Sequence, residues 1–215
     1  FANLSHISAE IKKALDETDV NDVNSIDKAS NVLCDVIHDT PMPQEIVDEI
    51  MESYKQLGGG YLAVRSSATA EDSAIASWAG ELETYLNTTQ DNLIENVKKC
   101  WSSLFTPRAI FYRHEKNLID HDVQVAVVLQ TMVQSEVSGV CFTVHPVTES
   151  QNQLIIEAGY GLGEAVVSGQ ITPDSYIVDK TNLEITDINV NKQTKKLVQQ
   201  GDKNVWVDLL EAEGD

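Results

Sequence analysis

The 215-residue sequence predicts an α+β fold, in which helices come first and a mostly antiparallel sheet follows. Two observations lead to this prediction. Apolar residues recur at helical spacing in the first part of the chain, and runs rich in Val, Ile and Thr, separated by turn residues, dominate from residue 123 onward. We therefore expect a helical segment over residues 1–60 and an α+β portion over residues 61–215.

The helices are predicted from the spacing of apolar side chains and from prolines at helix starts. Ile7, Ile11 and Leu15 would share one face of the first helix. The segment Pro41-Met42-Pro43 breaks the chain and starts the third helix, which Gly58-Gly59-Gly60 ends. The predicted helices span residues 4–17, 26–38, 43–57, 89–105 and 107–117.

The strands are predicted from short runs of β-branched and other apolar residues. Directly after the three glycines, Tyr61-Leu62-Ala63-Val64 is an apolar run that leads into a polar stretch of small residues. This junction of strand and loop is the most informative place in the sequence. Further strands are predicted at residues 83–87, 123–129, 137–144, 154–157 and 176–178, with weaker candidates at 183–190 and 204–209.

Composition and charge exclude several classes of function. A formal net charge of −19 would repel nucleic acid and anionic lipid, so neither is expected as a partner. The sequence has no run of about 18 apolar residues and no signal-peptide pattern at its start, which predicts a cytoplasmic protein that does not enter a membrane. Cys34, Cys100 and Cys141 lack C-x-x-C spacing, so we interpret them as buried small hydrophobic residues and not as zinc ligands or disulfides.

The segment Arg65-Ser66-Ser67-Ala68-Thr69 suits an anionic ligand. Small side chains let backbone N–H groups approach a phosphate, and the guanidinium supplies a bidentate charge. Further on, Ala76-Ser77-Trp78-Ala79-Gly80 is again composed mostly of small residues, as a flap over phosphates would be. The alternative is an ordinary loop at a strand end, whose hydroxyls bond to nearby backbone. The residues alone leave both interpretations open.

Longer strings of residues resemble a known family. The segment 63–72 (A-V-R-S-S-A-T-A-E-D), followed by A-S-W-A-G and E-T-Y-L-N, closely resembles the ATP-grasp domain of phosphoenolpyruvate synthases. Later motifs of that family follow in the same order, and together they cover roughly residues 40–180. They are S-L-F at 103–105, R-A-I-F-Y-R at 108–113, Q-T-M-V at 130–133, S-G-V-C-F-T at 138–143, G-L-G-E at 161–164 and P-D at 173–174.

The resemblance implies an ATP site and roles for particular residues. Arg65 would contact the ATP phosphates and act in catalysis, Gly80 and Thr84 would line the nucleotide, and Gln130 would lie at the adenine-binding hinge. For Thr84 the alternative is a threonine chosen for strand packing, and for Gln130 a solvated strand end. The other residues of the same string that we expect to bind the nucleotide are Ser66, Ser67 and Thr69.

The metal ligands stay undetermined, although Mg²⁺ is expected together with ATP. Glu157 and Glu164 are candidates for magnesium ligands or for carboxylates that lie next to those ligands. A surface or helix-capping role is equally compatible with both residues. The glycines at 159, 161 and 163 do not fit a G-x-G-x-x-G dinucleotide fingerprint, because residue 164 is a glutamate. His145 is not expected to be the phosphorylated histidine.

In phosphoenolpyruvate synthases, ATP phosphorylates a histidine on one domain, and the phosphoryl group then reaches pyruvate on another. Neither the T-x-G-G-x-x-C-H-A histidine string nor the pyruvate domain occurs here, and the G-G-K-x-x-x-L, D-I-E-W and Q-A-R-P-E strings are also missing. We therefore expect an incomplete ATP-grasp domain, inactive alone, whose partners are the phosphohistidine and pyruvate-binding domains of a longer parent chain. A homodimeric parent is left open.

Several functions remain compatible with these residues. The first is ATP binding in a phosphoenolpyruvate synthase, with the reaction ATP + pyruvate + water to AMP + phosphoenolpyruvate + phosphate. Pyruvate phosphate dikinases, rifamycin phosphotransferases and glucan dikinases share this nucleotide domain, so the final acceptor is not determined by it. A non-catalytic nucleotide-binding module is a further alternative, as is a structural domain that has lost ATP binding.

Overall fold

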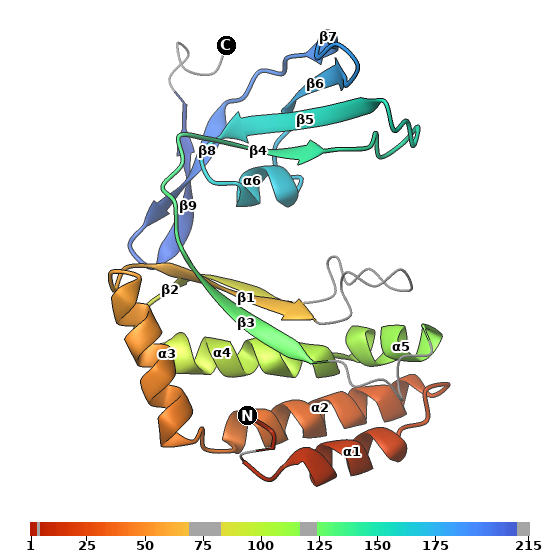
Figure 1. The fold of residues 1–215 in the computed structure, drawn as a ribbon, viewed down its shortest axis with the longest axis vertical. Helices are drawn as coiled ribbons and strands as arrows, with labels where there is room; N and C mark the ends of the chain where they lie inside the picture. The colour runs from red at the N-terminus through yellow and green to blue at the C-terminus, as the bar shows by residue number, and fades with distance from the viewer. Residues whose placement is uncertain (4, 69–82, 117–123, 210–215) are drawn as a thin grey trace. The chain divides into compact units, whose positions relative to one another are not determined.

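The computed structural model describes residues 1–3, 5–68, 83–116 and 124–209. The chain forms two compact units, Phe1–Met132 and Val133–Asp215 (Figure 1). The first unit combines α-helices with a small sheet, and the second consists mainly of antiparallel strands, so the predicted α+β fold class is confirmed. The predicted change from helices to strands near residue 60 falls inside the first unit.

The helices of the first unit form one of its two hydrophobic cores. Helix α2 buries Ile26, Leu33 and Ile37, which recur at helical spacing, and it packs on α1 and α5. Asp22 caps α2, because its side chain accepts a hydrogen bond from the backbone N–H of Asn24. The described helical elements of this unit are α1 (Ser8–Asp16), α2 (Val23–Asp39), α3 (Gln44–Gln56), α4 (Leu93–Ser102), the 3₁₀ turn η1 (Ser103–Phe105) and α5 (Pro107–Glu115).

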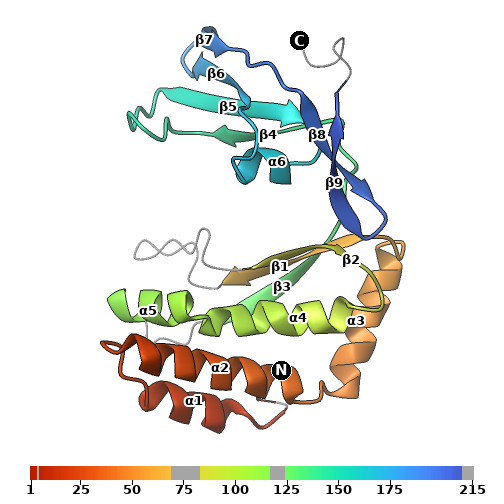
Figure 2. The ribbon, with the colours of Figure 1, turned by 180° about the vertical axis from the view of Figure 1, so that it is seen from behind.

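A three-stranded antiparallel sheet with the order β2-β1-β3 forms the other part of this unit. Strand β1 (Leu62–Ala68) lies between β2 (Thr84–Thr88) and β3 (Val125–Thr131). Leu62 and Val64 are fully buried in the second hydrophobic core, together with Val97 and other residues of α4. Both views show α4 running along the sheet (Figures 1 and 2). Helix α4 thus covers one face of the sheet.

The second unit contains a four-stranded sheet with the order β4-β5-β6-β7 and a separate hairpin of β8 and β9. All described neighbours in these sheets are antiparallel. The short helix α6 (Glu164–Val167) packs with the hairpin through Ala165 and Leu197. The strands are β4 (Val137–Phe142), β5 (Gln153–Tyr160), β6 (Asp174–Asp179), β7 (Ile185–Asn189), β8 (Lys195–Gln200) and β9 (Lys203–Asp208).

Two elements of the second unit were not predicted from the sequence, namely β8 and α6. Strand β8 begins with two lysines and ends with two glutamines, a composition that does not indicate a strand. It forms because each of its residues pairs with β9 and because Leu197 is buried against α6. Helix α6 has only four residues, too few for a helical period to show in the sequence.

None of the helices within the described residues is both long enough and apolar enough to cross a membrane. The described helices are instead amphipathic or short. Helix α4, for example, buries Leu93, Val97 and Cys100 and exposes Glu95.

The three cysteines are free thiols, but they differ in burial. Cys100 is fully buried and Cys34 is half-buried, whereas Cys141 is exposed. The prediction that all three are buried is therefore wrong for Cys141. That residue lies on β4 opposite Ile156, which is itself 37% exposed, because this face of the sheet is open to solvent within the described chain. An alternating apolar strand cannot reveal by itself which of its faces is covered.

We predict that thiol reagents will distinguish these cysteines. Burial raises the pKa of the Cys100 thiol to about 12, and it also raises that of Cys34, so few thiolates form at pH 8. At that pH a maleimide should modify Cys141 within minutes and leave Cys100 unmodified until the chain unfolds, as mass spectrometry of peptides would show. Cys141→Ser should abolish the fast reaction. Equal labelling of Cys100 and Cys141 in the folded chain would contradict the structure.

Candidate functional site

Arg65 lies in the middle of β1, where this strand is paired on both sides. The prediction that a loop begins after Val64 is therefore wrong, because Arg65 to Ala68 continue the strand by pairing with β3. The Cα partners of Arg65 are Thr84 on β2 and Val128 on β3. Directly opposite residues of an antiparallel sheet project to the same face, so these three side chains share one face. Leu62 and Val64 project to the other face and are buried with α4. The polar side chains are thus on the face that α4 does not cover.

Gln130 on β3 contacts the guanidinium directly. Nη1 of Arg65 donates a hydrogen bond to Oε1 of Gln130 at 3.1 Å. In the register of the sheet, Gln130 is opposite Ala63, two residues before Arg65, so the two polar side chains are diagonal neighbours on one face. We call the surface formed by Arg65, Thr84, Val128 and Gln130 the Arg65 face. All four residues are exposed.

The Arg65 face brings together three of the residues predicted from the sequence. Arg65, Thr84 and Gln130 come from three strands and are up to 65 positions apart in the chain. A guanidinium has five N–H donors, an amide has two more, and a threonine hydroxyl can donate or accept. These side chains can therefore present several hydrogen-bond donors and one positive charge to a ligand on this face.

The two serines of the R-S-S-A-T string project to opposite faces of β1. Ser67 is two residues from Arg65 and so lies on the same side of the strand, half-buried. Ser66 projects to the other side, and both its backbone N–H and its hydroxyl donate to the carbonyl oxygen of Glu83, at 3.2 Å and 2.8 Å. In this structure Ser66 therefore holds the start of β2 against β1. Thr69 and Gly80 lie outside the described residues.

The positive charge on the Arg65 face contrasts with a chain whose net charge is −19. Lys13 forms an ion pair with Glu17 and Lys99 forms one with Glu95, and neither pair involves Arg65. The guanidinium instead contacts a neutral amide, which does not neutralise it. An anionic ligand could consequently use the full charge of Arg65.

The chemistry of these side chains suits a ligand that carries phosphate groups. Phosphate oxygens can accept hydrogen bonds from the N–H groups of Arg65, and an adenine edge can form hydrogen bonds with the Gln130 amide. Within the described part of the chain, no group of three or more His, Cys, Asp or Glu side chains is close enough to hold a metal ion.

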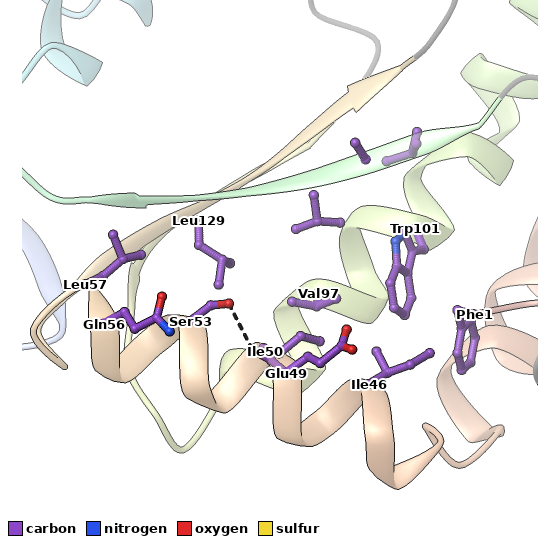
Figure 3. Close-up of a pocket in the computed structure, with 13 residues that line it drawn as sticks. Phe1, Ile46, Glu49, Ile50, Ser53, Gln56, Leu57, Val97, Trp101 and Leu129 are labelled. Atoms are coloured by element: carbon purple, nitrogen blue, oxygen red, sulfur yellow. Dashed lines mark hydrogen bonds between the residues drawn. The ribbon is translucent and has the colours of Figure 1, made fainter.

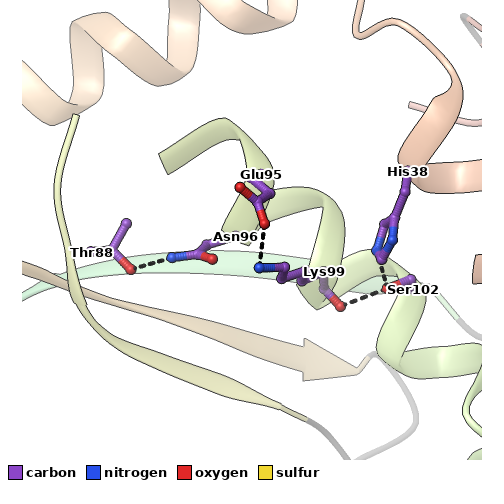
Figure 4. Close-up of polar contacts among 6 residues, drawn as sticks. All are labelled: His38, Thr88, Glu95, Asn96, Lys99 and Ser102. Atoms are coloured by element: carbon purple, nitrogen blue, oxygen red, sulfur yellow. Dashed lines mark hydrogen bonds and ion pairs between the residues drawn. The ribbon is translucent and has the colours of Figure 1, made fainter. Parts of the chain in front are cut away.

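A polar network behind the sheet holds β2 in place (Figure 4). Nδ2 of buried Asn96 donates to the hydroxyl of buried Thr88 at 2.8 Å, which joins α4 to the end of β2. Farther along α4, Nε2 of His38 and the hydroxyl of Ser102 are 3.0 Å apart, so α2 is joined to α4. The role of Asn96 could not be predicted from local patterns, because its partner Thr88 is eight residues away and in a strand.

The candidate residues of the second unit have structural contacts. Oε2 of Glu164 accepts a hydrogen bond from Nδ2 of Asn204 at 2.6 Å, and Glu157 is half-buried in β5. Nδ1 of His145 accepts from the backbone N–H groups of Val147 and Thr148, each at 3.3 Å, as expected of a turn residue. None of these contacts by itself indicates a ligand.

Comparison with known proteins shows which family and which relatives this chain is similar to. A family model described as pyruvate phosphate dikinase, AMP/ATP-binding domain, matches residues 1–214. The chain is 46% identical over 215 residues to a probable phosphoenolpyruvate synthase of Archaeoglobus fulgidus, covering 97% of this chain and 28% of that protein. It is 43% identical over 196 residues to the phosphoenolpyruvate synthase of Pyrococcus furiosus, covering 88% of this chain and 24% of that protein. The chain thus spans about a quarter of the length of these curated relatives.

Proposed function

We propose that this chain, which belongs to the pyruvate phosphate dikinase AMP/ATP-binding domain family, is the ATP-binding part of a phosphoenolpyruvate synthase. The reaction of the whole protein would be ATP + pyruvate + water to AMP + phosphoenolpyruvate + phosphate. It would proceed through a phosphohistidine on another domain of the parent chain. The relatives named phosphoenolpyruvate synthase are about four times as long as this chain, which leaves room for that domain and for a pyruvate-binding domain.

One observation carries the assignment of the site: an exposed guanidinium lies on an otherwise neutral sheet face, within the R-S-S-A-T string typical of the family. Arg65 would bind the transferring phosphates and stabilise the negative charge that develops as they leave. Such stabilisation is strongest when the charge is already oriented before the reaction. The hydrogen bond to Gln130 supports an oriented guanidinium.

The other side chains would position the nucleotide. Thr84 faces Arg65 from β2 and could bond to a phosphate or ribose oxygen, whereas Gln130 could share its amide between the guanidinium and the adenine edge. Ser67, Thr69 and Gly80 complete the proposed set, with Ser66 acting through its bond to the backbone of Glu83. Bound Mg²⁺ would supply further charge neutralisation at the phosphates.

The products formed by the full-length parent test the proposal. With ATP and pyruvate, a phosphoenolpyruvate synthase should form AMP, phosphoenolpyruvate and orthophosphate in equal amounts. In ¹⁸O-labelled water the orthophosphate should carry the label, because water is the second acceptor. The three products can be followed by phosphorus NMR and mass spectrometry.

Other outcomes of the same assay point to other members of the class. A pyruvate phosphate dikinase would need added orthophosphate and would release pyrophosphate, because phosphate replaces water as an acceptor. A rifamycin phosphotransferase would form AMP with the antibiotic in place of pyruvate. Absence of AMP with every acceptor, despite measurable ATP binding, would favour the non-catalytic module and overturn the proposed reaction.

A further inference from the structure

Strand pairing supports Thr84 less firmly than it supports the β3 residues of the Arg65 face. Strand β3 pairs with β1 at seven consecutive positions, so Val128 and Gln130 lie in an unbroken ladder. Strand β2 pairs with β1 at three described positions, and the register shifts between Leu62 and Val64. Thr84 is the first residue of β2, and its pair with Arg65 is the last of the three. The ends of such a ladder open easily unless other contacts hold them.

Three donors meet at the carbonyl oxygen of Glu83, directly before Thr84. The backbone N–H of Ser66 donates to this oxygen at 3.2 Å and the hydroxyl of Ser66 donates at 2.8 Å. The thiol of Cys100 approaches the same oxygen from α4 at 4.0 Å. Because this oxygen belongs to the peptide group that joins Glu83 to Thr84, the three contacts restrict the start of β2.

The thiol of Cys100 contacts both strands that carry the facing side chains. Its second acceptor is the carbonyl oxygen of Val64, at 3.6 Å. Val64 directly precedes Arg65, as Glu83 directly precedes Thr84. Burial raises the pKa of this thiol to about 12, so it keeps its proton and remains a weak donor. Cys100 thus joins α4 to the two peptide groups that position Arg65 and Thr84.

Ser66 and Cys100 both act from behind the Arg65 face. Ser66 alternates with Arg65 along β1, so its side chain projects to the side that α4 covers. Cys100 is fully buried on α4 itself. A ligand on the Arg65 face would therefore lie across the sheet from both side chains, and they could influence it only through the residues that they hold.

We propose that Ser66 and Cys100 are positioning residues of the nucleotide site, which hold the Glu83–Thr84 peptide group so that the hydroxyl of Thr84 stays opposite Arg65. The inference rests on the proposed function, because it requires a nucleotide on the Arg65 face. In this role Ser66 does not touch the nucleotide. Its hydroxyl contributes more than the thiol, because an O–H donor at 2.8 Å bonds more strongly than an S–H donor at 4.0 Å.

Steady-state kinetics of the full-length parent test the proposal. Ser66→Ala removes the hydroxyl, and we expect KM for ATP to rise about fivefold, as for the loss of one hydrogen bond. The kcat should change little, because Thr84 would hold the nucleotide equally well before and during the reaction. Ser66→Thr keeps a hydroxyl on a residue that suits a strand, so it should restore the wild-type KM. Cys100→Ala should raise KM by about twofold, since a thiol is a weak donor.

A double variant separates positioning from a loss of stability. Thr84→Val removes the hydroxyl through which Ser66 would act and keeps a side chain of similar shape. In the Thr84→Val background, Ser66→Ala should raise KM no further, because the two changes interrupt one interaction. A merely structural role of Ser66 would raise KM by the same factor in both backgrounds. That result, or a wild-type KM in Ser66→Ala, would overturn the proposal.

Two control variants remove similar bonds elsewhere. Ser53 lines an apolar groove between α3, α4 and β3, and its hydroxyl donates to the carbonyl oxygen of Glu49 at 2.9 Å (Figure 3). The thiol of Cys34 donates to the carbonyl oxygen of Ser102 at 3.8 Å. Neither bond involves Glu83, so Ser53→Ala and Cys34→Ala should both keep the wild-type KM.

The Arg65→Ala variant shows whether the positioning role or the whole site has failed. Impaired Arg65→Ala together with a wild-type KM in Ser66→Ala would overturn the positioning role alone. Wild-type kinetics in both variants would refute the nucleotide site and this inference with it.

Discussion

Replacing Arg65 with alanine in the full-length parent should lower kcat/KM for ATP by about 30- to 1,000-fold. Loss of one preorganised charged donor at a transferring phosphate costs on the order of 2–4 kcal/mol in the transition state, which corresponds to that range of rates. The guanidinium is exposed on the Arg65 face and is not needed for the core, so folding should be preserved. Steady-state kinetics of AMP formation would measure the effect.

Two further variants separate this role from a general effect of charge. Arg65→Lys keeps the charge but loses the bidentate geometry, so it should recover only part of the activity. Lys28→Ala removes an exposed cation from α2, away from the Arg65 face, and changes the net charge by the same amount. It should have wild-type kinetics. Wild-type activity in a correctly folded Arg65→Ala protein would refute the proposed site.

The hydrogen bond to Gln130 predicts a smaller effect from the opposite strand. Gln130→Leu removes the acceptor of the 3.1 Å bond and keeps a side chain of similar size. A hydrogen bond of this kind contributes about 1 kcal/mol, so roughly a fivefold loss is expected. Because the two residues act together, the effects of Arg65→Ala and Gln130→Leu should not add in the double variant. Full additivity would show that the bond has no role in the active protein.

Gly161→Ala should destabilise the second unit by on the order of 3 kcal/mol, because this position combines a strained backbone with a close approach. Gly161 has a φ of +85°, and a Cβ atom there would lie 2.2 Å from the carbonyl oxygen of Leu197. The backbone next to Gly161 is also held close to β8, because the N–H of Leu162 donates a hydrogen bond to the carbonyl oxygen of Leu197 at 2.8 Å. Relieving the collision would separate β8 from the end of β5. Thermal unfolding followed by circular dichroism would measure the loss.

Gly169→Ala is the matched control for this prediction. Gly169 also has a positive φ, +67°, but a Cβ atom there would meet nothing within 4 Å. Its replacement should therefore cost only the backbone strain, about 1 kcal/mol. Comparing the two variants separates the collision with Leu197 from the cost of the left-handed conformation. Equal stability losses would mean that the close packing at Gly161 contributes nothing.

The alternation and spacing of apolar residues were enough to predict most of the elements. The helices predicted over residues 26–38 and 107–117 are confirmed as α2, which buries Ile26, Leu33 and Ile37, and as α5, which begins at Pro107. The prediction failed for β8, whose ends are polar and whose stability comes from pairing with β9. Such a strand is stabilised by contacts with a neighbour, so its own residues indicate little.

The sequence also identified the residue types of the candidate site, because a guanidinium, hydroxyls and small side chains in one string suit a phosphate. It could not show that Gln130 would contact Arg65, since the two residues are 65 positions apart and meet only through the β1–β3 register. Nor did it show that Ser66 would bond to the backbone of Glu83, which follows from the opposite directions of neighbouring side chains in a strand.

By itself, then, the sequence determined the α+β class, the order of most helices and strands, and the chemical character of the proposed ATP-binding string. Those properties depend on residues that are close together in the chain. Only the tertiary structure decided which face of the sheet carries Arg65, that Cys141 is exposed, and that an apolar groove lies beside β3. Each of these depends on strand pairing and helix packing between distant segments, where a local pattern fits several partners and the packing of the whole unit selects one.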